Sequence, residues 1–236
     1  GWWAAGVGPS PLGPRLQAAI ALMAHRYRLS RRLIPDLLGE LLGRRLSPGT
    51  VQAVIERASA ACEAPVEEAR AVVAASPVVN ADETGWRHQG EAPKKRRHWV
   101  WVATGGKAAI FHVAPDRGAS GLAGVLPADY SGIVTADRWA VYASAYGERR
   151  QLCWAHLHRE VRAFADRGAI LTRGPDAQLR ARGTALAAWG KEADAAICAM
   201  FRLWHKFKDG RIDRQSLRRR MQRHESRLSG LLARGP

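Results

Sequence analysis

Two short strand-like runs of the sequence each end at an aspartate. Residues 78–81 lead into Asp82, and residues 133–136 lead into Asp137. Short apolar runs of this kind are typical of buried strands. Open α/β sheets build their sites from side chains at the C-terminal ends of such strands. The chain is therefore restricted to folds with a sheet, and that sheet carries two carboxylates.

Helical patterns surround these strands. The first helix is predicted over residues 14–28. A second has Ser30 as its N-cap and ends at Gly43, and a third begins at Ser47-Pro48 and extends to about residue 75. Further strands are predicted over residues 97–104, 109–113 and 150–153, and further helices over 115–126, 156–166 and from 176 onward. This order predicts a mixed α/β layer architecture.

The same patterns suggest four segments. Residues 1–13 are rich in Gly and Pro and are predicted to be a linker. Residues 14–76 form a helical domain, either helix-turn-helix-like or an ordinary packing domain. Residues 77–170 form the α/β core, and residues 171–236 form a basic helical insertion.

The charge of the chain favours a polyanionic partner. The net charge is +16, and residues 166–236 carry sixteen Lys and Arg against seven Asp and Glu. Neutralising phosphates with such side chains releases counterions, so a nucleic acid is the expected partner, and a solvated basic surface is the alternative. No apolar run approaches the roughly 20 residues of a membrane span. Three widely spaced cysteines favour a reducing, cytoplasmic compartment.

The two aspartates suggest a divalent metal site. If the two strands are neighbours, Asp82 and Asp137 lie close together, and two ionised carboxylates repel unless a cation lies between them. Oxygen ligands favour Mg²⁺ or Mn²⁺ over Zn²⁺. Two such ions, about 3.5–4 Å apart, suit phosphodiester chemistry. Alternatively, each aspartate only begins a turn or caps a helix.

Three local motifs carry a family resemblance. They are Asp82-Glu83-Thr84, Asp137-x-x-x-x-Tyr142 and Cys153-Trp-Ala-His156, in this order. Together with residues 46–50, they closely resemble transposases of the insertion sequence 66 family. The resemblance implies a ribonuclease H-like core in which Asp82 and Asp137 are the first two acids of an Asp-Asp-Glu triad.

The resemblance also implies an activity. Mg²⁺-dependent cleavage of transposon ends would be followed by transfer of the 3′ hydroxyl to target DNA. Two ends must be brought together, so a homo-oligomer on DNA is expected, in the cytoplasm and associated with the nucleoid. Cys153 and His156 would support the core beside the site.

The family's third acid belongs to an Asn-Asn-x-x-Glu-Arg motif, which this sequence lacks. The chain also begins without a methionine, so we expect either a fragment of a longer frame or a broken, inactive product. Glu160 is the nearest substitute by position, but a surface residue paired with Arg159 or Arg162 is the favoured interpretation. Glu83 follows Asp82 directly and therefore points to the opposite face of a strand.

Several other side chains have two interpretations. The run Lys94-Lys95-Arg96-Arg97 and the triplet Arg218-Arg219-Arg220, with Arg223 and Arg227, are either phosphate contacts or solvated surface. Trp99 and Trp101 are predicted to be core residues. Cys153, His156 and His158 have feasible spacing for zinc, but a closed site needs four ligands, and nothing in the sequence brings Cys62 or Cys198 near.

Two alternative functions remain open at this point. One is a DNA-binding remnant that cuts nothing. The other is a nuclease on the same core, which hydrolyses DNA without joining it. Salt-sensitive binding without cleavage indicates the first, and cleavage without joined product indicates the second.

Overall fold

A computed structural model describes residues 12–43, 45–87 and 97–235. Internal contacts divide the chain into two compact units, Gly1–Gly132 and Ile133–Pro236. The sequence-based segments 14–76, 77–170 and 171–236 remain predictions.

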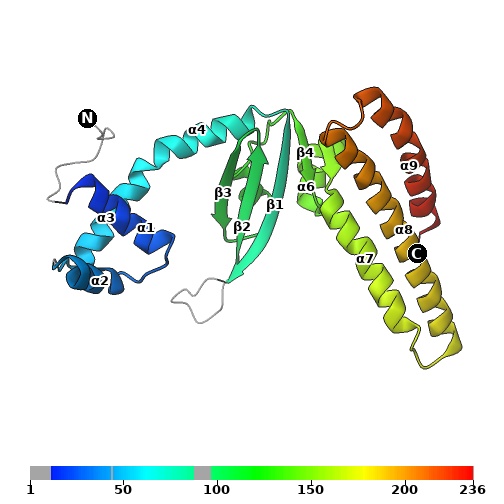
Figure 1. Cartoon of the computed structure of the whole chain (residues 1–236), viewed down its shortest axis with the longest axis horizontal. Coiled ribbons are helices and arrows are strands. Elements are labelled where there is room, and N and C mark those ends of the chain that lie inside the picture. The colour runs from blue at the N-terminus through cyan, green and yellow to red at the C-terminus, as the bar shows by residue number, and fades with distance from the viewer. Residues whose placement is uncertain (1–11, 44, 88–96, 236) are drawn as a thin grey trace. The chain divides into compact units, whose positions relative to one another are not determined.

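Four helices begin the first unit: α1 (Pro14–His25), α2 (Leu33–Leu42), α3 (Pro48–Ala61) and α4 (Glu63–Ala74) (Figure 1). The predicted N-cap of α3 is confirmed, because the backbone N–H of Thr50 donates to Ser47 Oγ at 3.0 Å. The expected single helix to residue 75 is interrupted at Cys62. Pro65 lacks the N–H that would continue the ladder onto Ala61. The small core of α1, α2 and α3 consists of Ile20, Ile34, Leu38, Val51 and Val54.

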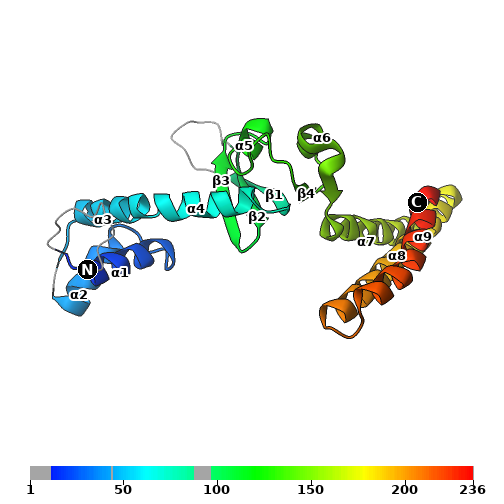
Figure 2. The ribbon, with the colours of Figure 1, turned by 90° about the horizontal axis from the view of Figure 1, so that it is seen from above.

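Three antiparallel strands follow in the first unit: β1 (Val78–Arg87), β2 (Arg97–Gly105) and β3 (Ala108–Ala114), in the order β3-β2-β1. The predicted end of β1 at Asp82 is wrong. Pairing with β2 continues to Arg87, so Asp82 lies in the middle of a strand. Helices α4 and α5 (Ala119–Ala123) contact this sheet (Figure 2). Trp101 is fully buried, as predicted for the core.

The second unit combines two parallel strands with a helical region. Strands β4 (Ile133–Ala136) and β5 (Arg150–Leu152) are joined by α6 (Ala140–Tyr146) and the 3-10 turn η1 (Gly147–Arg149). Three helices follow: α7 (Trp154–Leu171), α8 (Ala177–Lys208) and α9 (Arg214–Arg234). Their shared core contains Val161, Ala193, Ala196, Ile197, Met200, Leu228 and Leu231.

Small residues let α7 and α8 approach closely. A Cβ at Gly168 would lie 2.3 Å from the backbone N of Ala187, and one at Gly190 would lie 2.7 Å from the backbone N of Ala165. Both contacts are shorter than any tolerated separation. These two glycines therefore set the distance between the helix backbones.

Aspartates cap the two C-terminal helices. Asp176 Oδ1 accepts from the backbone N–H of Leu179, and Asp213 Oδ1 accepts from that of Ser216, each at 2.6 Å. The hydrogen bond from Ser216 favours the carboxylate form and lowers the pKa of Asp213. The sequence predicted the start of α8 near residue 176, but it did not predict the break before α9 or its cap at Asp213.

The mixed α/β class with flanking helices is confirmed. Antiparallel and parallel strand pairs both occur, preceded by a helical segment and followed by another, which is consistent with a ribonuclease H-like core. Among the described helices, none combines the length and the apolar character needed to cross a membrane.

We expect Gly121→Ala to destabilise the first unit. A Cβ at residue 121 would lie 2.1 Å from Nε1 of the buried Trp101 indole. Forcing that ring to move costs about 1–3 kcal/mol, which would appear as a lower urea midpoint. Gly49→Ala in α3 is the matched control, since its Cβ meets only Ser47 Oγ at 3.6 Å. Equal midpoints for the two variants would contradict this packing account.

Candidate active site

Asp137 lies directly after β4, at the C-terminal end of a parallel strand pair. Ala136 is opposite Leu152 in the register, and the backbone N–H of Cys153 donates to the carbonyl of Ala136 at 2.8 Å. This bond extends the pairing to the last residue before Asp137. Asp137 Oδ1 accepts from the backbone N–H of Trp139 at 2.8 Å, which turns the chain toward α6. The carboxylate is thus fixed at the strand end, as the sequence predicts.

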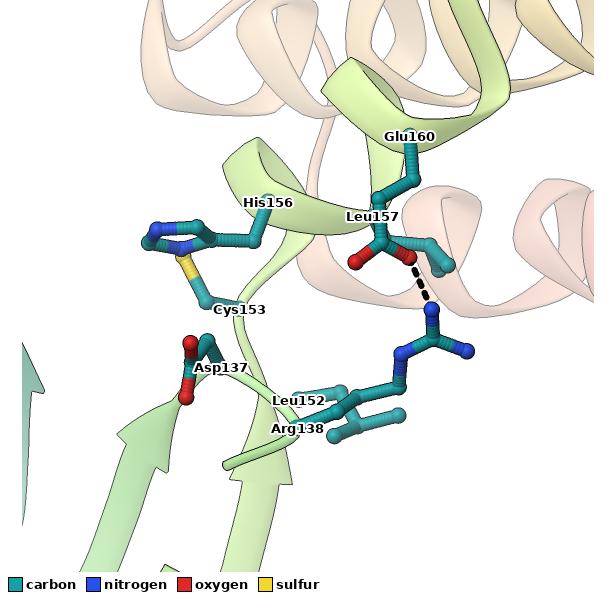
Figure 3. A pocket seen from close by; sticks show the side chains of 7 residues that line it. All are labelled: Asp137, Arg138, Leu152, Cys153, His156, Leu157 and Glu160. Atoms are coloured by element: carbon teal, nitrogen blue, oxygen red, sulfur yellow. Dashed lines mark hydrogen bonds and ion pairs between the residues drawn. The ribbon is translucent and has the colours of Figure 1, made fainter. Parts of the chain in front are cut away.

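A small pocket opens at this strand end (Figure 3). The carboxylate of Asp137 lies on the same side of it as the side chains of Cys153 and His156. Cys153 is the N-cap residue of α7 and His156 is in its first turn, so the positive end of the helix dipole is at the pocket. The lining residues are Asp137, Arg138, Leu152, Cys153, His156, Leu157 and Glu160.

Glu160 lines the same pocket, but its carboxylate is engaged. It forms an ion pair with Arg138, so the predicted pairing with Arg159 or Arg162 is wrong. The cause is the chain turn after β4, which brings Arg138 under α7. The side chains are 61% (Arg138) and 42% (Glu160) exposed, so water screens the pair. Sequence reasoning missed Arg138, whose only signal was its place next to Asp137.

Asp82 is half-buried in the middle of β1, on the same strand face as Asn80 and Thr84. Its Oδ1 accepts from the backbone N–H of Glu83 at 3.0 Å. Asp82 belongs to the first unit and Asp137 to the second. Their convergence on shared metal ions therefore stays a prediction.

Glu83 points to the other face of β1, as expected from strand geometry. Its side chain is fully buried, and its Oε1 accepts from Arg117 Nε at 2.7 Å and pairs with a second Arg117 nitrogen at 2.5 Å. Arg117 and Arg97 both stack on Trp99, with guanidinium carbons 4.8 and 4.7 Å from the ring centroid. Trp99 is therefore a half-buried platform for cations and only partly the core residue that was predicted.

The predicted basic residues fall in different places. Lys94, Lys95 and Arg96 lie outside the described residues, and Arg97 is the side chain that stacks on Trp99. Arg218, Arg219 and Arg220 are all exposed on α9. Only part of this triplet faces an open groove of the second unit, which is lined by Leu203, Arg219, Arg220, Arg223, His224 and Arg227.

The zinc grouping of Cys153, His156 and His158 is not formed. Residues two positions apart in a helix differ in direction by about 200°. His156 therefore faces the pocket, whereas His158 faces α8 and contacts Asp194. Cys198, which no sequence pattern placed near these residues, has its Sγ 3.9 Å from His158 Nε2.

We expect Glu83 to be structural. Glu83→Ala leaves Arg117 without its buried partner and should lower the free energy of unfolding by about 2–3 kcal/mol. The expected loss is smaller than for a fully buried pair because the Arg117 side chain is 30% exposed. Arg117→Ala should cost a similar amount, and the double variant much less than their sum. Urea denaturation checks this coupling, with Thr84→Ala as the exposed neighbouring control. Additive losses would reject the ion pair as the cause.

One comparison with known proteins is informative. The model of the Transposase IS66 family matches residues 9–233 of the chain. No curated protein matches it in sequence. The match covers both units, including Asp82, Asp137, Cys153 and His156. This extent, together with an aspartate held at the end of a parallel strand in a mixed α/β core, shows that the chain belongs to the Transposase IS66 family.

Proposed function

We propose that the chain is the catalytic region that cleaves transposon ends and transfers the freed strand to target DNA, with Asp82 and Asp137 as metal ligands. The observation that carries this proposal is the position of Asp137. Its carboxylate follows β4 directly and lines a pocket at the start of α7, in a family of DNA transposases. Assembly of two or more copies on DNA is part of the proposal, because two ends must be joined to one target.

The residues present fit a hard divalent cation. Asp82 and Asp137 offer carboxylate oxygens, which are the ligands that Mg²⁺ and Mn²⁺ prefer. When bound, the metal would activate the attacking oxygen and stabilise the leaving oxygen at the phosphodiester. Arg138 is held by Glu160 on the other side of the pocket, away from the Asp137 carboxylate (Figure 3).

The protein's own groups would position the DNA backbone. The N-terminal end of α7 attracts a phosphate through its dipole. Cys153 and His156 flank the Asp137 carboxylate and give the pocket its wall. Glu160 is a candidate third acid because it lines the same pocket. Its carboxylate must separate from Arg138 before it can bind a metal ion.

Substituting either proposed ligand should abolish cleavage. We expect Asp82→Asn and Asp137→Asn to lower nicking of a labelled transposon-end duplex in Mg²⁺ by at least about 100-fold, because neutral amides bind the cation poorly. The exposed acids Asp129 and Asp166 provide matched controls in the two units, and Asp129→Asn and Asp166→Asn should cleave normally.

The products of this assay distinguish a transposase from the two alternative functions. Joined products support a transposase, and hydrolysed ends without joining support a nuclease. Salt-sensitive binding with no cleavage by the unsubstituted chain supports the DNA-binding remnant. Cleavage that survives both aspartate substitutions contradicts the proposed ligands.

A DNA-binding surface is proposed on α9. Arg219, Arg223 and Arg227 follow one another at helical spacing and line the groove beside Leu203, with Arg220 next to them. Arg218 is exposed but is not among the lining residues. A row of guanidinium groups on one helix face matches the repeated phosphates of a DNA strand.

Removing this row should change the salt dependence of binding. Each lost phosphate contact lowers the slope of log K against log salt by about 0.9, so Arg219→Ala, Arg223→Ala and Arg227→Ala together should lower it by about 2–3. Fluorescence anisotropy on duplex DNA at several salt concentrations measures this slope. Arg218→Ala is the control for the single variant Arg223→Ala, since each removes one positive charge. An effect of Arg218→Ala on the slope as large as that of Arg223→Ala would contradict the groove.

A further inference from the structure

Three side chains of the metal-ligand types meet where α7 packs on α8. His158 comes from α7, and Asp194 and Cys198 come from α8, one helical turn apart. His158 Nε2 is 2.6 Å from Asp194 Oδ1. Cys198 Sγ is 3.9 Å from His158 Nε2 and 4.0 Å from Asp194 Oδ2. One atom from each side chain lies within 4.8 Å of the other two.

The surrounding packing fixes these positions. Val161 and Ile197 are buried next to the group in sequence, within the core that α7, α8 and α9 share. Gly168 and Gly190 hold the two helix backbones close together. All three ligand side chains are half-buried, so water and ions reach them while their backbones stay in place. The arrangement is therefore set before any ligand binds.

We propose that His158, Asp194 and Cys198 bind a zinc ion, with water as the fourth ligand. With Zn–S near 2.3 Å and Zn–N and Zn–O near 2.0–2.2 Å, a tetrahedral site has ligand-to-ligand separations of about 3.3–3.6 Å. Cys198 Sγ is about 0.3–0.7 Å farther than this from His158 Nε2 and from Asp194 Oδ2. Asp194 Oδ1, the other oxygen of the same carboxylate, is about 0.7–1 Å closer than this to His158 Nε2. One of the two Asp194 oxygens would serve as the ligand, and small rotations of the three side chains would bring the donor atoms to these separations.

The donor chemistry selects the metal class. An imidazole nitrogen, a carboxylate oxygen and a thiolate sulfur together suit Zn²⁺, whereas Mg²⁺ prefers oxygen ligands only. On binding, the Cys198 thiol loses its proton to solvent, and the neutral His158 ring bonds the ion through Nε2. The His158–Asp194 contact is replaced by two bonds to the ion.

Arg162 is a cation that contacts this group. Its Nε is 3.9 Å from Asp194 Oδ1, and its side chain is 70% exposed. A contact so long and so well solvated contributes little and yields to a divalent ion. The site is distinct from the Asp137 pocket, because His158 and His156 lie on different sides of α7. Zinc here would fasten α7 to α8 without entering the DNA chemistry.

Cobalt spectroscopy tests the proposal without DNA. The whole chain, stripped with a chelator and kept reduced, is titrated with Co²⁺, which replaces Zn²⁺ in thiolate sites. We expect one equivalent to give tetrahedral d–d bands and a thiolate-to-cobalt charge-transfer band, both removed by added Zn²⁺. His158→Ala and Asp194→Ala should weaken Co²⁺ binding at least about 10-fold, and Cys198→Ser should remove the charge-transfer band.

Two other cysteines provide controls. Cys62→Ser removes an exposed thiol of the first unit, and Cys153→Ser removes the thiol of the Asp137 pocket, so both should keep the band. Circular dichroism verifies that each variant is folded, and Zn²⁺ should raise the Tm of the unsubstituted chain but not of Cys198→Ser. No charge-transfer band in the unsubstituted chain, or a band that survives Cys198→Ser, overturns the site. A band lost in Cys153→Ser overturns it as well.

Discussion

The parallel pairing of β4 with β5 is the constraint on which the functional geometry of the second unit depends. Its last hydrogen bond, from the N–H of Cys153 to the carbonyl of Ala136, sets two positions in the chain. One is the end of β4, which Asp137 follows directly, and the other is the start of α7. Because both follow from one hydrogen-bonded register, a slip of one residue would turn Asp137 away from the pocket.

Two faces of helix α7 contribute to two different sites. Its first turn presents His156 to the pocket that Asp137 lines, and the face that carries His158 meets α8. The close approach permitted by Gly168 and Gly190 makes the second face a fixed surface. The same helix thus connects the proposed DNA chemistry to the proposed zinc site, although the two sites share no ligand.

Neighbouring acids in this chain have different roles because their environments differ. Asp82 and Glu83 are adjacent in β1, yet Asp82 lies on the face with Asn80 and Thr84, and Glu83 is buried against Arg117. Burial against Arg117 gives Glu83 a structural role, since its fully buried carboxylate would be a costly charge without that partner. Glu160 lines the same pocket as Asp137, and its carboxylate forms an ion pair with Arg138.

The sequence by itself determined the local features: the helix start at Ser47, the strand that leads into Asp137, the opposite directions of Asp82 and Glu83, and the family. Each depends on residues within a few positions of one another, where capping, alternation and short motifs act. Only the tertiary structure decided which distant side chains meet. The pairing of Glu160 with Arg138 and the grouping of His158 with Asp194 and Cys198 depend on how a turn and two helices pack. The continuation of β1 past Asp82 also depends on a partner strand, because hydrogen bonds from β2 extend it. Such contacts join residues that are far apart in the sequence, so local sequence patterns do not predict them.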